Sequence, residues 1–235
     1  MSASSRAKYR SSGGTIYSDA LTVQAMNVAN LLLRLPKYGG ENEAMTGLQG
    51  SYRPYTSYSG TTHTGCGVVD MTAYNWGNRL IVLDLLGIDV FHRLPFEGDW
   101  PEHCHNVTRG MGCVAASARG QSAAVQSGHN GLTVRGLDRD AHLRSGLWSL
   151  AVYNGRTGRL RAKQATHTYD GPSYDRKRLR EIEKGFQVDA IMEVNVDGKR
   201  WFVTKNGGWG YSNKWEKVPT MTRLFTKPLT SVDYA

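Results

Sequence analysis

Long hydrophobic runs are missing from this sequence of 235 residues. The longest, such as Leu31–Leu33 and Leu80–Leu83, fall far short of the roughly 18 residues that a membrane-spanning helix needs. The sequence also has no Gly-X-Y period and no internal repeat, which excludes a collagen-like chain. Because 40% of the residues are hydrophobic, the composition is too apolar for a disordered chain. We therefore expect a globular protein without a membrane span.

Cysteine is scarce, and there are only three: Cys66, Cys104 and Cys113. An odd number in a chain of this size argues against a disulfide framework and favours synthesis in a reducing compartment. Residues 1–14 are polar, basic and rich in serine and glycine, without the apolar stretch of a secretory signal. They predict a flexible tail and synthesis in a cytoplasm.

Acidic residues are outnumbered, with 29 Lys+Arg against 20 Asp+Glu and a formal net charge of +9. This balance favours an anionic partner, and nucleic acid, anionic lipid and bacterial wall polymers all fit it. The densest basic run, residues 176–180, is interleaved with acidic residues, which is more typical of a solvated helical face. No helix-turn-helix, zinc-finger or RNP pattern supports nucleic-acid binding.

The spacing of apolar residues, caps and turns predicts three helices, two strands and two hairpins. A helix is expected from Ala20 to Leu35, capped by Ser18 or Asp19 and ended by Pro36. The other elements are a helix at Trp76–Leu86, strands at Val68–Met71 and Ile88–Phe91, a charged helix from Ser173 to Glu183, and hairpins of Leu147–Tyr153 with Arg159–Ala162 and of Val188–Val196 with Lys199–Lys205. Residues 110–164 otherwise predict little.

Residues typical of a metal site follow one another between positions 63 and 105. His63 precedes Asp70 by seven residues, and Glu102 precedes His105 by three. Zinc (Zn²⁺) prefers a few nitrogen and oxygen ligands in a tetrahedron, with one position open to water at a catalytic site. Two histidines and an aspartate supply that set, and a nearby glutamate can accept the proton of the bound water.

In these residues the sequence resembles the zinc D,D-peptidases of bacterial cell walls, the D-alanyl-D-alanine carboxypeptidase and dipeptidase group, which includes many phage endolysins. Ser51-Tyr52-Arg53 matches the start of the family signature, His63 and Asp70 match its His-x6-Asp, and Glu102 and His105 match its Glu/Asp-x-x-His. The resemblance implies that His63, Asp70 and His105 bind zinc and that Glu102 is the general base. It also implies that Arg53 stabilises negative charge on the substrate carbonyl.

The sequence departs from the family at two positions beside these residues. Cys66 stands where the family usually has glycine, and Cys104 stands where an aromatic residue commonly precedes the last histidine. Among distant relatives a His-x-His pair, here His103 and His105, closes the motif without the carboxylate. Cys66 and Cys104 are open to three interpretations: buried thiols, a disulfide formed after release, or a zinc ligand in which Cys104 replaces His105.

Aromatic residues gather near the C-terminus, and this segment has two interpretations. Trp201, Trp209, Tyr211 and Trp215 are most simply the core of a small β module. Alternatively, one or two of them stack on sugar rings or grip a wall peptide. The stretch Trp201–Trp209 resembles the bacterial SH3-type wall-binding modules, which implies a role in wall binding.

Together these patterns predict an α+β fold, with a small antiparallel sheet, packed helices and a zinc site. The expected domains are a zinc peptidase-like domain at 15–165, with its core at about 15–112, and a β module at 186–235. The resemblance implies a peptidase that cleaves amide bonds in peptidoglycan stem peptides, acting as a phage lysin or from a virion, with peptidoglycan, anionic wall polymers and virion proteins as partners. The alternatives are a non-catalytic virion or wall-binding protein with the same fold, and a basic nucleic-acid-binding protein.

Overall fold

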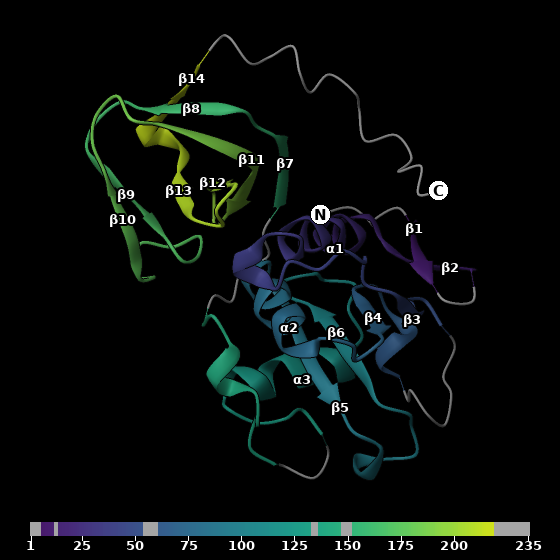
Figure 1. The fold of residues 1–235 in the computed structure, drawn as a ribbon. Coiled ribbons are helices and arrows are strands. Elements are labelled where there is room, and N and C mark those ends of the chain that lie inside the picture. The colour runs from purple at the N-terminus through teal and green to yellow at the C-terminus, as the bar shows by residue number, and fades with distance from the viewer. Residues whose placement is uncertain (1–5, 12–13, 54–60, 133–135, 147–151, 219–235) are drawn as a thin grey trace. The chain divides into compact units, whose positions relative to one another are not determined.

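The computed structural model describes residues 6–11, 14–53, 61–132, 136–146 and 152–218. The chain divides into two compact units, which we describe separately (Figure 1). The N-terminal unit comprises Met1–Tyr153 with Asn195–Gly198, and the C-terminal unit comprises Asn154–Val194 with Lys199–Ala235. Among the described residues, no helix is long and apolar enough to cross a membrane.

The N-terminal unit is an α+β fold, as predicted. Its six-stranded sheet has the order β2-β1-β3-β4-β6-β5 and is antiparallel except where β1 meets β3. The strands are β1 (Arg6–Ser11), β2 (Gly14–Asp19), β3 (Gly47–Gln49), β4 (Val68–Met71), β5 (Ile88–Arg93) and β6 (His103–Thr108). The helices are α1 (Ala20–Leu33), α2 (Trp76–Leu85) and α3 (Ala116–Gln126). The predicted helices at 20–35 and 76–86 and the strands at 68–71 and 88–91 are confirmed.

The central strands β4, β6 and β5 present two faces with different coverings. Residues paired directly across an antiparallel ladder share a face, and neighbours along a strand alternate between faces. Val68 and Val107 pair on one face, where Ala118 and Val125 of α3 pack against them; we call this the α3 face. On the other, the α2 face, the ring of His92 stacks on Trp76 with 4.4 Å between the ring centroids.

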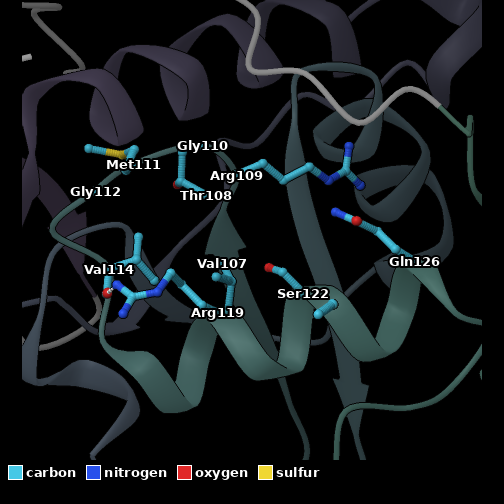
Figure 2. Close-up of a pocket in the computed structure, with 11 residues that line it drawn as sticks. Val107, Thr108, Arg109, Gly110, Met111, Gly112, Val114, Arg119, Ser122 and Gln126 are labelled. Carbon is cyan, nitrogen blue, oxygen red and sulfur yellow. Dashed lines mark hydrogen bonds between the residues drawn. The ribbon is translucent and has the colours of Figure 1, made fainter.

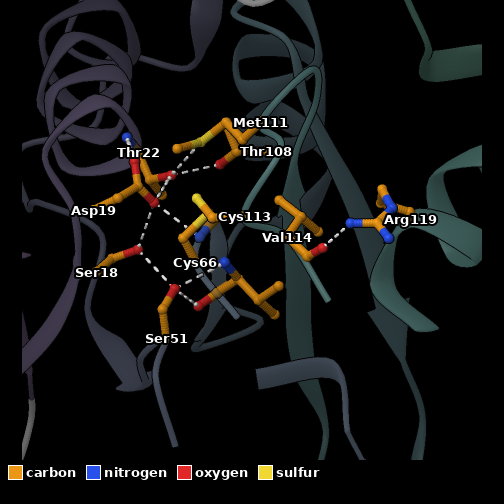
Figure 3. Close-up of a disulfide and its surroundings, with 12 residues drawn as sticks. Ser18, Asp19, Thr22, Ser51, Cys66, Thr108, Met111, Cys113, Val114 and Arg119 are labelled. Carbon is orange, nitrogen blue, oxygen red and sulfur yellow. Dashed lines mark hydrogen bonds between the residues drawn. A yellow bond between two sulfur atoms is a disulfide. The ribbon is translucent and has the colours of Figure 1, made fainter. Parts of the chain in front are cut away.

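The start of α1 is tied to the loop before β4 through one buried carboxylate (Figure 3). Asp19 caps α1 as predicted, accepting from the backbone N–H of Thr22 at 2.8 Å. Its other oxygen accepts from the Gly67 N–H at 2.8 Å, and the Thr22 hydroxyl bonds that of Thr108 on β6 at 2.7 Å. This network fixes the end of the loop that leads from His63 into β4.

A disulfide between Cys66 and Cys113 joins the same loop to the segment that precedes α3 (Figure 3). The Cys66 N–H also donates to the Cys113 carbonyl at 3.0 Å. Only glycine fits at position 65, because a Cβ there would collide with the Cys113 carbonyl oxygen. The two backbones therefore run in close contact, and α3 is held beside the loop that carries His63.

The C-terminal unit contains an eight-stranded sheet: seven strands have the order β10-β9-β13-β12-β11-β8-β14, and the eighth, β7, pairs with β11. The strands are β7 (Val152–Arg156), β8 (Arg159–Ala162), β9 (Thr166–Tyr169), β10 (Arg178–Ile182), β11 (Gln187–Val196), β12 (Lys199–Thr204), β13 (Trp209–Tyr211) and β14 (Trp215–Lys217). Asp197 and Gly198 have φ of 51° and 74°, which confirms the predicted type I′ turn between β11 and β12. Trp201, Phe202 and Trp209 are fully buried in this unit.

Several sequence-based expectations differ from the structure. The predicted tail over residues 1–14 contains β1, because a six-residue ladder with β2 stabilises this polar segment. The charged segment expected as a helix from Ser173 to Glu183 contains β10, which pairs with β9 at the end of the sheet. Pairing with β9 holds β10 in extended conformation at the edge of the sheet. Four of its five side chains are exposed, so no buried face favours a helix here.

The predicted hairpin and the domain boundary also change. β8 pairs with β11 and β14 rather than with the segment at 147–153, of which residues 147–151 lie outside the described residues. The C-terminal unit begins at Asn154, so the module extends upstream of the predicted start at 186. The boundary was missed because β8 to β10 complete a sheet whose central strands come later in the chain.

The disulfide yields a first prediction. It closes a segment with a sequence separation of 47 residues, and constraining such a loop in the unfolded chain contributes about 2–4 kcal/mol. A thiol reductant should therefore lower the free energy of unfolding of the N-terminal unit by that amount, measured by urea denaturation. Cys104→Ala should remain as sensitive to reductant as the parent, whereas Cys113→Ala should be insensitive; equal sensitivity of both variants would contradict the assignment.

Candidate metal centre

His63 presents one ring nitrogen that has no hydrogen-bond partner. The residue lies in the short 3-10 helix Thr62–Thr64 and is 1% exposed. Its Nδ1 lies 3.0 Å from the Gly50 carbonyl oxygen; because a carbonyl only accepts, Nδ1 carries the hydrogen and Nε2 of the neutral ring carries a lone pair. This Nε2 is 3.1 Å from Oδ2 of Asp70, yet it makes no hydrogen bond within the described structure.

His105 meets the same carboxylate from the neighbouring strand. Asp70 and His105 are directly paired across β4 and β6 on the α3 face, and His105 Nδ1 lies 2.7 Å from Asp70 Oδ1. Its Nε2 lies 2.9 Å from Oε1 of Gln121 on α3. Both ring nitrogens thus face oxygen atoms, while a neutral imidazole has only one N–H.

Burial determines the charge of these groups. It lowers the pKa of His105, against the opposing effect of the Asp70 carboxylate. Burial raises the pKa of Asp70, but the interactions with His105 and His63 outweigh it and hold that pKa well below its usual range. The site is therefore a buried, charged Asp70 carboxylate faced by the ring of His105, whose protonation is disfavoured, and by the ring of His63.

A cation between these three side chains would satisfy their electron pairs. With His105 Nε2–H donating to Gln121, the lone pairs of His63 Nε2 and His105 Nδ1 both point toward the Asp70 carboxylate. One ligand atom from each residue lies within 4.8 Å of the others. His63, Asp70 and His105 could therefore hold a metal ion, and Gly50 and Gln121 would orient the two imidazoles through their second nitrogens.

Glu102, the predicted general base, does not join this group. Its carboxylate lies 2.6 Å from His92 Nε2 and its side chain is 49% exposed. His92 lies on the α2 face, because it pairs with Cys104 while its neighbour Phe91 pairs with His105. Glu102 comes just before β6, three positions from His105, and its contact with His92 holds its carboxylate away from the α3 face.

His103 shares the face of the metal group instead. It is two residues from His105 on β6 and pairs with Arg93 of β5. Its Nδ1 lies 2.7 Å from the Pro101 carbonyl oxygen, so Nδ1 donates and the lone pair of the neutral ring is on Nε2. Of the two candidate acid–base residues in this segment, His103 is the one on the α3 face.

Neither Cys66 nor Cys104 is a ligand of the candidate metal site, and the two are not bonded to each other. Cys66 is paired with Cys113 rather than with Cys104. Cys104 is a free, buried thiol whose pairing with Met71 and His92 puts it on the α2 face. Burial raises its pKa to about 12, so Cys104 remains a thiol and does not replace His105 as a ligand.

The Ser51-Tyr52-Arg53 segment runs beside the His63 loop. The Tyr52 N–H donates to the Gly65 carbonyl at 2.9 Å and the Arg53 N–H to the His63 carbonyl at 2.8 Å. Ser51 is buried, and its hydroxyl donates to the Val68 carbonyl at 2.8 Å. Arg53 itself is exposed, so the segment positions the loop through its backbone and Ser51.

The aromatic residues of the C-terminal unit are mostly core. Trp201, Trp209 and Trp215 are 1%, 0% and 5% exposed, which leaves these three rings no free face for a sugar. Tyr211 is half-buried. The interpretation of these residues as a core is confirmed for the tryptophans.

Sequence reasoning missed Gln121 and Arg93. Gln121 comes from α3, in a stretch whose composition predicted little, and its contact with His105 depends on tertiary packing. Arg93 lies two residues beyond Phe91 on β5, where alternation along a longer strand would have placed it on the same face. The expected strand ended at Phe91.

Two pockets flank α3, and one of them is lined by Gln121. A pocket of about 390 Å³ lies between residues 107–114 and α3, with Arg119, Ser122 and Gln126 along the helix (Figure 2). Its Arg109 is already ion-paired with Asp84 and Asp89. The other, of about 510 Å³, is lined by Gln121 and by Gly120, Ala124, His129 and Gly131. We call this second pocket the Gln121 pocket; its one link to the candidate ligands among these lining residues is Gln121, whose Oε1 lies 2.9 Å from His105 Nε2.

The lowered pKa of His105 gives a pH-dependence prediction for protein stripped of metal by a chelator. The unfolded chain binds a proton at His105 more readily than the folded chain, so stability should fall as the pH drops from 8 through about 6.5. Asp70 acts in the same direction, but only as the pH falls below 3.8. Urea unfolding at pH 8 and 5.5 should show a smaller loss for His105→Gln than for the parent. The exposed His142→Gln should behave like the parent, and an unchanged slope in His105→Gln would contradict the prediction.

Comparison with known proteins adds no relative to this description. No protein-family model, curated protein or solved structure matches the chain. The metal centre therefore stands on the geometry of the chain itself: His63, Asp70 and His105 form a buried group that could bind a metal ion.

Proposed function

We propose that the protein is a zinc-dependent peptidase that hydrolyses amide bonds in peptidoglycan stem peptides. The observation that carries the proposal is the lone pair of His63 Nε2 facing the Asp70 carboxylate at 3.1 Å without a hydrogen. Two imidazoles and a carboxylate match the ligands that catalytic zinc uses. The order of these residues, preceded by Ser51-Tyr52-Arg53, supports the resemblance to zinc D,D-peptidases.

Zinc held by His63, Asp70 and His105 would polarise a substrate carbonyl and lower the pKa of a bound water. The chain's own residues would orient the ligands, since Gly50 and Gln121 fix the tautomers of the two histidines. The disulfide and the Asp19 network hold the loop before β4 in place. The Gln121 pocket, which shares Gln121 with the contact to His105, would offer room for part of a peptide.

For proton transfer we propose His103 in place of Glu102. His103 shares the α3 face with His105, whereas Glu102 is bound to His92 on the α2 face. A general base must come within hydrogen-bond reach of the water, directly or through one further water. The His-x-His spacing puts His103 on the same face of β6 as His105, which makes it the better placed of the two residues.

The net charge of +9 supports an anionic partner, and teichoic or related acidic wall polymers fit such a peptidase. A lysin made in the host cytoplasm, or a hydrolase carried in a virion, would meet this partner at the cell wall. Charge attracts the enzyme at long range, while the metal centre would select the bond that is cut.

The test combines metal analysis with mass spectrometry of digested walls. Purified protein should hold one zinc per chain, and His63→Ala should lose it. Wild-type protein should release muropeptides with new free amino termini, identifying the cleaved bond. His103→Gln should lower the rate at least a hundredfold, within the range that a general base contributes.

Glu102→Gln is the matched control, since it changes the neighbouring carboxylate and leaves the α3 face intact. It should retain zinc and most of the activity; loss of activity in Glu102→Gln with full activity in His103→Gln would reverse the assignment. Absence of stoichiometric zinc, or wall digestion by His63→Ala at the parental rate, would refute the peptidase proposal.

A non-catalytic wall-binding protein is the second candidate, and the position of Glu102 favours it. A chain that kept the fold but lost the family's base would have its carboxylate off the site, as here. Such a protein would bind zinc and walls yet release only intact muropeptides. Metal content together with the muropeptide masses therefore distinguishes the two candidates.

Wall binding by the C-terminal unit remains a proposal. Because the tryptophans are buried, we assign the binding role to Tyr174 instead. This ring is 43% exposed and packs on Trp201 and Tyr211 with centroids 5.2 and 5.3 Å away. Lys199 Nζ lies 6.0 Å from its centroid, so an aromatic surface and a cation are adjacent.

Tyr174→Ser should weaken binding to purified walls about threefold to tenfold, the value of one aromatic contact. A wall pull-down over a range of wall concentrations measures this. Tyr17→Ser is the control, because Tyr17 is 46% exposed on the N-terminal unit. Equal weakening by both substitutions would contradict a role for Tyr174.

A further inference from the structure

Arg93 places a buried guanidinium group on the same sheet face as the candidate ligands. It is the last residue of β5, pairs with His103 of β6 and follows Phe91 by two positions. Since Phe91 pairs with His105, the three residues Phe91, Arg93 and His103 share the α3 face with the metal group. Arg93 is nevertheless only 4% exposed, which is unusual for a charged side chain.

Its contacts leave part of the guanidinium unused. Nη1 donates to the Asn130 carbonyl at 2.9 Å, and the guanidinium carbon lies 4.7 Å from the Phe91 ring centroid. That ring is 5.9 Å from the ring of His105, which links Arg93 to the metal group through one side chain. Nη2 is buried, and none of the described residues accepts a hydrogen bond from it.

The charge around Arg93 is not balanced locally. Burial lowers its pKa to about 10, with the carboxylates of Glu97 and Asp70 acting against the burial and Arg139 and Arg144 adding to it; the group stays cationic at neutral pH. Glu97 is already bound to Arg139 at 3.0 Å, and Asp70 faces the two histidines. A second buried cation, Arg144, lies 6.0 Å from the Phe91 ring; it is ion-paired with Asp138, but its Nη1 has no acceptor in the described chain.

We propose that Arg93 is a specificity residue that binds a carboxylate of the substrate beside the metal group. A buried N–H without an acceptor is costly, and a carboxylate would satisfy Nη2 with a charge-assisted hydrogen bond. This inference rests on the proposed peptidase function and names the group that the site selects. The carboxylate has two sources in a peptidoglycan stem: the C-terminus of the peptide, or the side chain of an acidic residue within it.

The experiment compares binding and cleavage of stem peptides that differ in one carboxylate. The zinc-loaded full chain is titrated by calorimetry with a pentapeptide stem, with its C-terminal carboxamide, and with the peptide amidated at its internal carboxylate. Hydrolysis of each is followed by mass spectrometry. One of the two amidated peptides should bind about tenfold to a hundredfold more weakly than the parent, the range for a hydrogen bond to a charged group, and which one identifies the source.

Arg93→Gln should bind all three peptides with similar affinity while retaining its zinc. Arg139→Gln is the matched control: Arg139 pairs with Glu97 and its side chain is 44% exposed, so the variant should keep the preference for the carboxylate. Arg93→Lys, which keeps the charge and a donor, guards against misfolding and should keep part of that preference.

The outcomes separate this inference from the function on which it rests. Hydrolysis without a carboxylate preference, or a preference that survives in Arg93→Gln, overturns the role of Arg93 and leaves the peptidase proposal standing. Carboxylate-dependent binding without hydrolysis supports Arg93 and refutes the peptidase. Absence of both binding and hydrolysis overturns both.

Discussion

The buried carboxylate of Asp70 is the constraint on which the N-terminal unit depends. A carboxylate can stay charged out of water only when cations or hydrogen-bond donors surround it. Here its neighbours are the rings of His63 and His105, at 3.1 and 2.7 Å, and each ring uses its other nitrogen on an oxygen elsewhere. Burial disfavours a proton on His105, and the three side chains together could hold a metal ion.

The rest of the unit holds this group in register. The β4–β6 ladder sets Asp70 directly opposite His105, while His63 comes from a loop with no ladder of its own. That loop is fixed at three points: the Gly50 carbonyl holds the ring of His63, the disulfide joins Cys66 to the start of α3, and Asp19 binds the Gly67 N–H. Because α3 also supplies Gln121, a single covalent link between Cys66 and Cys113 restrains both the His63 loop and the helix that orients His105.

Much of this could be inferred from local patterns, and the limits of that inference have physical reasons. Helix caps and breakers such as Asp19 and Pro36, and the apolar strand ending in Asp70, are encoded within a few residues, so they were predicted. The order of the candidate ligands His63, Asp70 and His105 could be predicted because it depends only on residue type and position in the sequence. The Cys66–Cys113 pairing, the Gln121 contact and the assembly of β8 to β10 depend on segments far apart in the chain, which no local pattern reports. Polar segments such as β1 and β10 form strands because neighbouring strands offer hydrogen bonds, not because their composition favours extended structure.

Side chains alternate between the two faces of a β-strand, and this alternation explains why His103 lies beside the candidate ligands whereas Glu102 does not. In a Glu-x-x-His spacing the two side chains share a face on a helix, where residues three apart are neighbours, but lie on opposite faces of a regular strand. Residues 103–108 form a strand, and Glu102 lies just before it, where its carboxylate contacts His92 on the α2 face. His-x-His and Phe-x-Arg spacings keep parity, and they bring His103, Phe91 and Arg93 to the face of His105. Even separations along β5 and β6 therefore determine which side chains lie beside His105. They place there the imidazole that we propose for proton transfer and the guanidinium that we propose for binding an anion. The carboxylate of Glu102 instead contacts His92 on the α2 face.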